Sequence, residues 1–546
     1  LKHYKMAEKI VSPGVFTKEN DLSFLQQGVA EIGAAFIGPF KEGPLVPTIV
    51  NSQAEFETLY GIVDDTYYTP LAVQNYLREA GTATICRVAG VGGYLVQNPL
   101  LLTLTTGSVS ASVGILFPSD KNTLSTGLSG SSFTTLSDGD FIISITGSTN
   151  FAGTSSMDSE DINDIESTFG TSAIAPKGAY VYGLFKNHSV TIGTNTSASV
   201  TLLDDQNFGF DAQEALTPMI KSQTISGDRF DLFQFETIGA GNTSNTKVKI
   251  GITNIKAAGT VNGTDYGTFT VVVRDFNDTN KKKNVLETYS NVNLDPNSPN
   301  YISRVIGDRK LSIDGLGKIS ETGDWVNNSK YVRIQNLNES APIQAVPFGH
   351  SAYQLPISAS AAVGALVPSV TFLSASATVY GGIDLDFNSD NSIYLKPIPV
   401  GAGVGSNSVF GLDVASGGSL LVGSTSAQFV VAFQEGFDGM SPATPIYKGT
   451  DIIAGNSQGF DLSTSTASGS IAYGKHVSAL SNADEFDINM VVTPGVIRRL
   501  HTSVVTSVLD MVEQRDDCFY IMDTNASGDS ISLAITQADA IDSNMT

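Results

Sequence analysis

The stretch that decides the fold begins with Phe486-Asp487-Ile488-Asn489-Met490-Val491-Val492, turns at Thr493-Pro494-Gly495 and ends with Asp517-Cys518-Phe519-Tyr520-Ile521-Met522-Asp523. The first and last segments are apolar runs of strand length, and Thr-Pro-Gly is typical of a turn. Between them, apolar residues recur at spacings of three and four, which predicts a helix: Ile497, Leu500, Val504, Val508 and Met511. This order predicts two parallel strands joined by a crossover helix, a βαβ unit.

A second α/β segment lies near the start of the sequence. An apolar strand bounded by glycines runs from Gly28 into the turn Gly38-Pro39. Ser52-Gln53-Ala54-Glu55 is a capping box that predicts a helix ending at Gly61. A second helix is expected from the cap Thr69 to Gly81, followed by a strand over Thr82–Val88. Residues 20–94 are therefore expected to form a compact α/β unit.

Between these segments the composition favours β structure. Charged residues make up only 16% of the chain, and 53 glycines accompany long Ser/Thr/Asn tracts. Residues 95–227 show short apolar runs without a helical period. Alternation then predicts strands at Val248–Ile252 and Phe269–Val273, with a turn at 277–282 that leads into a hairpin partner.

We therefore predict a multidomain chain of mixed α+β and α/β class. The predicted division has an N-terminal arm (1–20), a discontinuous α/β core (21–94 with 228–334), β-rich barrel- or sandwich-like insertions (95–227 and 335–440) and a C-terminal α/β domain (441–546). A helical pattern from Ile531 to Ala540 is followed by no further strand, so we expect the C-terminal domain to be truncated.

Charge and cysteine usage restrict the partners. The formal net charge is −23, and the only basic run is Lys281-Lys282-Lys283, which is expected to be a solvated hairpin turn, so nucleic acid is not a predicted partner. Cys86 and Cys518 lie in apolar runs and are expected to be buried free thiols. The apolar stretch 355–380 is broken by Pro368 and serines, so no membrane span is predicted.

One motif suggests an enzyme. Gly455-Asn456-Ser457-Gln458-Gly459 matches the G-x-S-x-G pattern of a nucleophile elbow, with His476 or His501 as a possible base and Asp487 to orient it. The mechanism needs a helix directly after the serine, and the Ser/Thr-rich sequence that follows favours a loop instead. A serine hydrolase is kept as an alternative.

Other patterns give weaker signals, and we predict no cofactor and no metal. Gly401–Gly405 lacks the final glycine of a dinucleotide loop. The alternating residues Asp384, Asp386, Asn388 and Asp390 lack the turn glycine and the bidentate Glu of an EF-hand. The five histidines have no metal-ligand spacing. Trp325, the single tryptophan, is expected to anchor a core or an interface.

The N-terminal segment has a different character. Ser12-Pro13-Gly14-Val15-Phe16-Thr17-Lys18-Glu19 reads as a turn followed by a short extended arm. An extended arm has unpaired backbone donors and acceptors that can join an open sheet edge. The alternative for this segment is an ordinary frayed terminus.

Four segments, in order along the chain, resemble the tail sheath proteins of contractile-tailed bacteriophages. They are the arm with the strand that follows it, Pro70–Val88, the hairpin with Leu286–Leu294 and Asn300–Ile306, and Phe486–Asp523. Together they span roughly half of the chain.

The resemblance implies a structural subunit that polymerises around a tail tube and contracts to drive the tube through the host envelope. It implies other sheath subunits, the tube protein and the baseplate as partners, a place in the virion after synthesis in the host cytoplasm, and an arm, Ser12–Glu19, that links subunits. Without the missing C-terminal portion this chain would be a monomer. A β-rich surface adhesin or capsid-associated protein is the first alternative.

Overall fold

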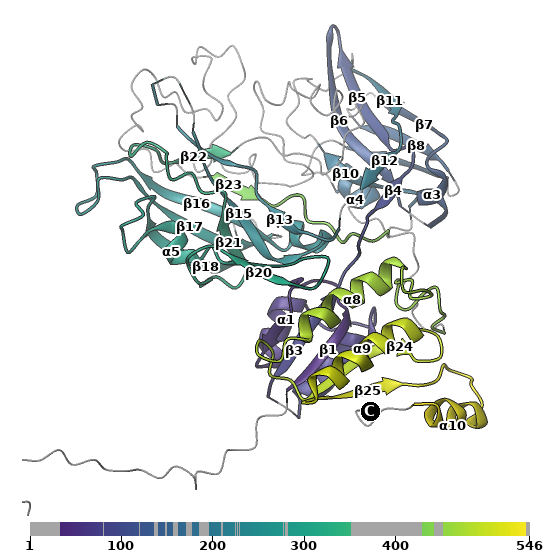
Figure 1. The fold of residues 1–546 in the computed structure, drawn as a ribbon. Coiled ribbons are helices and arrows are strands. Elements are labelled where there is room, and N and C mark those ends of the chain that lie inside the picture. The colour runs from purple at the N-terminus through teal and green to yellow at the C-terminus, as the bar shows by residue number, and fades with distance from the viewer. Residues whose placement is uncertain are drawn as a thin grey trace, which may run out of the picture.

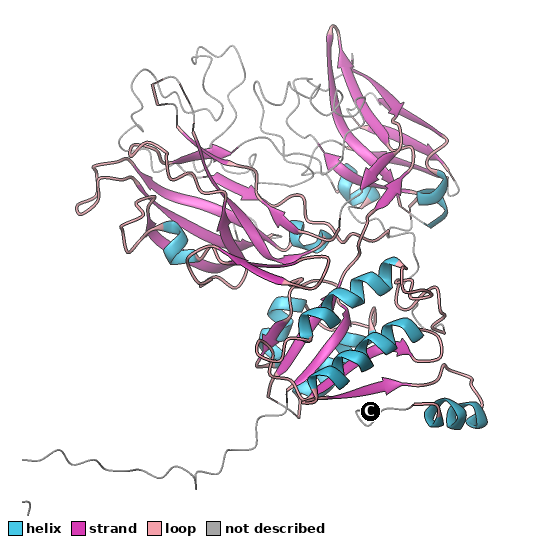
Figure 2. Cartoon of the chain, viewed as in Figure 1, coloured by secondary structure: helices cyan, strands magenta, loops and turns pink. Residues whose placement is uncertain are grey.

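The computed structural model describes residues 33–79, 81–119, 121–135, 140–147, 150–156, 162–170, 177–184, 196–208, 211–223, 225–226, 228, 230–276, 278, 282–350, 429–441 and 451–541. Helices and several sheets are combined, as the sequence predicts, and the sheets fall into bodies with their own apolar cores (Figures 1 and 2). We call these the α/β body, the insertion body and the central body.

The α/β body is built on a five-stranded sheet in the order β2-β3-β1-β24-β25. Its strands are β1 (Ala34–Pro39), β2 (Thr48–Val50), β3 (Ala83–Val88), β24 (Met490–Ile497) and β25 (Phe519–Asp523). All neighbours run parallel except β2, which is antiparallel to β3. Register pairs Ala34 with Met490, and Met490 with Phe519. The two ends of the described chain therefore share one sheet.

Helices cover both faces of this sheet. Its helices are α1 (Gln53–Tyr60), α2 (Tyr68–Leu77), α8 (Ser468–Leu480), α9 (Thr502–Arg515) and α10 (Ile531–Asp539). Ala35 and Ile37 of β1 pack in one core with α8 and α9, and Ala34 and Phe36 pack in the other with α1 and α2. Alternate residues of one strand thus face opposite layers, which is why β1 is apolar throughout.

The two predicted helices near the start form for different reasons. The Ser52 hydroxyl accepts from the Glu55 amide at 3.1 Å, and Gly61 ends α1 at φ +83°. The predicted cap Thr69 is wrong, because α2 begins at Tyr68 and Thr69 is buried against Gly38. The side chain of Gln458 accepts from the Tyr68 amide at 2.8 Å instead. A side chain distant in the sequence therefore accepts the hydrogen bond at the start of α2, where no local side chain acts as a cap.

The insertion body leaves the α/β body through a two-stranded neck, β4 (Tyr94–Val96) with β12 (Gln206–Phe208). Its two sheets, β10-β6-β5-β11 and β7-β8-β9, share one apolar core. The elements are β5 (Leu100–Thr106), β6 (Val109–Pro118), α3 (Lys121–Thr126), β7 (Gly130–Thr135), β8 (Phe141–Thr146), β9 (Phe151–Ser155), α4 (Ile165–Phe169), β10 (Ala179–Leu184) and β11 (Thr196–Leu202).

The central body carries most of the remaining strands around one core that includes Phe233, Phe235 and Phe269. Its elements are β13 (Glu214–Leu216), β14 (Ile220–Ser222), β15 (Asp231–Ala240), η1 (Asn242–Thr246), β16 (Val248–Lys256), β17 (Thr268–Asp275), β18 (Val285–Val292), α5 (Ile302–Ile306), β19 (Lys310–Ile313), β20 (Ile319–Thr322), β21 (Val332–Gln335), β22 (Pro347–His350) and β23 (Phe429–Ala432). The predicted hairpin is β17 with β18, and both ends of the second predicted insertion, β22 and β23, pair with strands of this body.

The predicted core division differs from the sheet topology. Residues 228–334, grouped by prediction with 21–94, build sheets of their own, whereas β1 pairs with β24 of the predicted C-terminal domain. The physical reason is that the pairing of β1 with β24 joins strands from opposite ends of the chain, and a parallel neighbour leaves no local signal in the sequence.

The neck generates a first prediction. Gln206 lies directly opposite Val96, so replacing residues 97–205 by a turn of about two residues, such as Asn-Gly, closes a hairpin. Because the insertion body has its own core, the shortened protein is expected to keep its cooperative unfolding and its melting temperature to within a few degrees. Circular dichroism melts and limited proteolysis measure this. Loss of cooperative unfolding in the shortened protein would contradict it.

Candidate functional site

The α/β body and the central body meet around one buried side chain, Arg87 of β3, which is 2% exposed. Its guanidinium donates to the carbonyl oxygens of Gly43 and Ala240, each at 2.8 Å, and to that of Phe40 at 3.3 Å. Phe40 and Gly43 follow β1, whereas Ala240 ends β15 of the central body. The Asp438 carboxylate lies 3.5 Å from the same guanidinium. One cation therefore bonds to both bodies.

The backbone around Arg87 is shaped to fit it. Asp438 and Asn242 exchange two hydrogen bonds of 3.2 Å, each backbone amide donating to the other side chain. Gly241, the residue before Asn242, adopts φ +101°. A Cβ atom at this position would lie 2.2 Å from Oδ1 of Asp438 and 3.0 Å from Nη2 of Arg87. Only glycine fits this position without displacing the ion pair.

Three connections between the bodies run side by side at this point. The Gly90 amide donates to the Asp438 carbonyl at 3.1 Å, and the Ala212 amide donates to the Gly90 carbonyl at 3.0 Å. A Cβ on Gly439 would lie 2.3 Å from the Gly90 oxygen. We call residues 87–92, 211–213, 240–242 and 437–439 the junction. The backbone hydrogen bonds of the junction hold these connecting segments side by side, so the segments are not free linkers.

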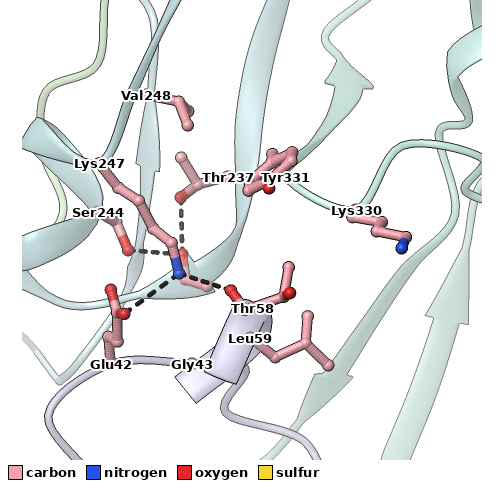
Figure 3. A pocket seen from close by; sticks show the side chains of 11 residues that line it. Glu42, Gly43, Thr58, Leu59, Thr237, Ser244, Lys247, Val248, Lys330 and Tyr331 are labelled. Atoms are coloured by element: carbon pink, nitrogen blue, oxygen red, sulfur yellow. Dashed lines mark hydrogen bonds and ion pairs between the residues drawn. The ribbon is translucent and has the colours of Figure 1, made fainter. Parts of the chain in front are cut away.

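A second contact between the bodies lies beside the junction (Figure 3). Nζ of Lys247 is 3.2 Å from Oε1 of Glu42 and donates to the carbonyl of Thr58 at 2.9 Å. The hollow around these groups measures about 20 Å³. That volume holds about one water molecule. This place therefore joins α1 to the central body and has no room for a ligand.

The far edge of the α/β sheet is open among the described residues. β25 pairs with β24 alone, and its Phe519 and Ile521 are 46% and 47% exposed while Tyr520 between them is buried. Parallel sheets are normally covered on both faces. α2 packs against β1, β3 and β24 and leaves one face of β25 half bare. An unpaired backbone edge and an apolar face are thus presented together.

The helix after β25 adds to this surface. No residue of α10 is buried, and its Ile531 and Ile535 are 82% and 57% exposed. Arg499 binds the Asp529 carboxylate through two bonds of 2.9 Å, and Arg498 donates to the Ala540 carbonyl at 2.9 Å. Arginines after β24 therefore anchor both ends of α10, while its apolar side chains stay in solvent.

The predicted nucleophile Ser457 is fully buried. Its hydroxyl donates to the Gly495 carbonyl at 2.6 Å, and a bridge to Phe460 follows it where the mechanism needs a helix. Nδ1 of His501 accepts from the Ile497 amide at 2.9 Å, and Asp487 is exposed. In the described part of the chain no hydrogen bond joins Ser457 to a histidine. The structure does not bring the predicted triad together.

Other predicted residues are placed as follows. Cys86 and Cys518 are buried free thiols, as predicted, and burial raises the pKa of Cys518 to about 11. Trp325 is half-buried beneath the Arg304 guanidinium, 5.3 Å from its ring centre. The described residues hold no cluster of three metal-ligating side chains. Among these residues, no helix has the length and apolar character to cross a membrane.

Several sequence candidates lie outside the described residues. They are the arm Ser12–Glu19, the stretch 355–380, the alternating Asp and Asn residues between 384 and 390, and the glycine loop 401–405. Sequence reasoning, in turn, missed Arg87. The signal was present, because an arginine inside the apolar run Thr82–Val88 must find buried acceptors.

Comparison of the sequence with protein-family models and with curated proteins gives no match.

The junction generates a stability prediction. Arg87→Met leaves Asp438 and several buried carbonyls without their partner, and is expected to lower the free energy of unfolding by about 3–5 kcal/mol. Arg78→Met, at an exposed arginine of the same body, serves as the matched control and is expected to change it by less than about 0.5 kcal/mol. Urea unfolding measures both. An equal decrease in the free energy of unfolding of both variants would show that Arg87 does not stabilise the junction.

A second prediction concerns pH. His476 is 4% exposed, its Nδ1 has no partner, and burial lowers its pKa to about 4 from an unfolded value of about 6.5. The unfolded chain therefore takes up the proton first, and stability falls as the pH drops from 6.5 toward 4. At pH 5 this one group is expected to cost roughly 2 kcal/mol. His476→Gln should flatten the pH dependence of urea unfolding between pH 7 and 5, and an unchanged slope would contradict the assignment.

Proposed function

We propose that this chain is a structural, non-enzymatic subunit of a contractile phage tail sheath. It assembles with copies of itself around a tail tube, contacts a baseplate, and contracts to drive the tube through the host envelope. The protein is made in the host cytoplasm and works in the virion without a cofactor. The sequence resemblance suggests this function, and the open edge at β25 and the junction support the proposed way of assembly.

The observation that carries the proposal is the open edge at β25. Its outer backbone edge, which pairs with no strand among the described residues, and the half-exposed side chains of Phe519 and Ile521 form a site for an added strand. The sequence of the arm Ser12–Glu19 predicts an extended segment, and we propose that the arm of a neighbouring subunit supplies this strand. Backbone hydrogen bonds between subunits survive rigid-body shifts of the rest of each copy, as a contracting lattice needs.

Three of the four segments that carry the resemblance also belong together, whereas the hairpin segment supplies β18 and α5 of the central body. The strand after the arm contains β1, Pro70–Val88 contains most of α2 and all of β3, and Phe486–Asp523 contains β24, α9 and β25, which we take as the expected βαβ unit. These elements share one sheet although they come from opposite ends of the chain. The proposal treats this sheet as the part that links subunits and the insertion body as an outward decoration.

The junction supports a mechanical role. A subunit that transmits force must not bend between its linking sheet and its outer bodies. Arg87 and Lys247 tie the α/β body to the central body through charged hydrogen bonds. The hydroxyl of Ser457, the nucleophile of the hydrolase alternative, is committed to the Gly495 carbonyl. The adhesin alternative gives no role to an open edge on a parallel sheet.

The arm provides the test, in the full-length protein. Deleting residues 7–20 is expected to abolish tubes in negative-stain electron microscopy, because the added strand is lost. A more specific test compares two double variants of the arm, Val15→Pro/Thr17→Pro and, as its control, Val15→Ala/Thr17→Ala. Proline removes backbone donors, so the first variant should assemble poorly and the second should form tubes. Undisturbed tubes from the deletion would contradict the proposed linkage.

A further inference from the structure

The order of strands in the α/β sheet reverses between β1 and β24. From β1 the chain crosses through α1 and α2 to β3 on one side, whereas β24 and β25 are added on the other side. α1 and α2 cover one face of the sheet, and α8 and α9 cover the opposite face. In sheets of this kind a crevice opens beyond the carboxyl ends of the two strands where the order reverses, and ligands bind in it. The carboxyl ends of β1 and β24 are therefore where this fold would hold a ligand.

β1 and β24 separate at this crevice. Their register ends at Phe36 and Val492, although both strands continue beyond these residues. Residues 493–496 of β24 also lie outside its register with β25. The start of α2 lies on the end of β1, because a Cβ on Gly38 would be 2.1 Å from Oγ1 of Thr69. The crevice is thus bounded by the end of β24 and by the first turn of α2.

The chain fills this crevice with a hairpin turn of its own. The backbones of Ser457 and Phe460 pair with each other, and Gln458 and Gly459 at the tip have φ values of +55° and +95°. Positive φ at both central residues is the pattern of a type I′ turn. Ser457 is 0% exposed and Gln458 is 1% exposed. Polar turns normally lie in solvent, whereas this one is buried.

The side chain of Gln458 bonds to both walls of the crevice. Its Oε1 accepts from the Tyr68 amide at the start of α2 at 2.8 Å, and its Nε2 donates to the Pro494 carbonyl at 2.9 Å. The Ser457 hydroxyl donates to the neighbouring Gly495 carbonyl at 2.6 Å. Gly495 has φ +84°, and a Cβ there would lie 2.3 Å from Nε2 of Gln458. One carboxamide thus satisfies a donor on α2 and an acceptor on β24, as a bound ligand would.

The turn by itself does not favour glutamine at this position. Positive φ at the first central residue of a type I′ turn favours glycine, asparagine or aspartate. A glutamine there carries a conformational cost, which contacts of its side chain must offset. The two hydrogen bonds of the Gln458 carboxamide are such contacts.

We propose that the crevice between β1 and β24 is a binding site for a primary carboxamide, and that the chain fills it with its own Gln458. Residues 457–460 then act as a built-in plug that closes the crevice to other ligands and holds α2 against β24. The site needs a neutral group that both accepts and donates a hydrogen bond, and a carboxylate lacks the donor. The inference concerns the single chain and does not depend on the proposed assembly.

Two substitutions at the tip of the turn give the first test. Gln458→Gly and Gln458→Asn both suit the turn better than glutamine, so the turn alone would predict a higher melting temperature. We expect both variants to melt several degrees lower than the parent, because glycine has no carboxamide and the shorter asparagine does not reach both partners. Differential scanning calorimetry measures this.

The matched control has the same backbone conformation without the buried contacts. Asn291 is exposed and has φ +56°. Asn291→Gly is expected to stay within about 2 °C of the parent melting temperature.

Propionamide gives the second test, because it has the carboxamide and the carbon chain of a glutamine side chain. The melting temperature of Gln458→Gly is expected to rise with propionamide concentration and to recover at least about half of the loss. Propionate cannot donate to the Pro494 carbonyl and should give no rise. The parent and Asn291→Gly should not gain stability from propionamide, since the parent crevice is filled and the control leaves it filled.

Each outcome decides the proposal. Melting temperatures of both tip variants at or above that of the parent would overturn the plug. A destabilised Gln458→Gly that responds to propionamide and propionate alike, or to neither, would overturn the carboxamide site. Should Gln458→Gly not fold alone, refolding with propionamide but not with propionate is expected to recover it, and recovery with neither counts against the site.

Discussion

The buried guanidinium of Arg87 is the interaction on which the rest of the structure depends. A guanidinium offers five N–H donors and cannot lose its charge, so inside a protein it must be surrounded by acceptors. Here the acceptors come from the turn after β1, from the end of β15 and from Asp438 beyond β23. Separating the α/β body from the central body would break the contacts of this guanidinium with Ala240 and Asp438. Two bodies with separate cores are thereby made one mechanical unit.

Local signals in the sequence predicted local structure well. The Ser52–Glu55 cap, the alternation at Val248–Ile252 and the strand–helix–strand order around α9 describe interactions between residues close in sequence. The division into domains was less predictable. Placing β24 beside β1 depends on two apolar strands finding each other from opposite ends of the chain, and apolar strands are interchangeable at the level of pattern. The cap of α2 is a similar case, because Gln458 acts from a distant loop.

The candidate site was harder to predict than the fold. Phe519 and Ile521 look like core residues in the sequence, just as Tyr520 does, and only the arrangement of helices shows that one face of β25 is left bare. Arg87 had a sequence signal, but its acceptors lie on carbonyls that no residue pattern identifies. Exposure and backbone acceptors are properties of the assembled fold, and for that reason a search by residue type instead found Ser457, which the fold buries.

The charge of the chain constrains how such a subunit can polymerise. Surfaces with the same sign of charge repel each other within a Debye length, about 8 Å at physiological ionic strength. Hydrogen bonds between backbones need no charged side chain, so an added strand can hold two copies together although their net charges repel. Salt screens the repulsion that opposes such a contact and leaves its hydrogen bonds in place. A lattice whose copies are linked by added strands can therefore change its packing while the copies stay connected, as a contracting sleeve requires.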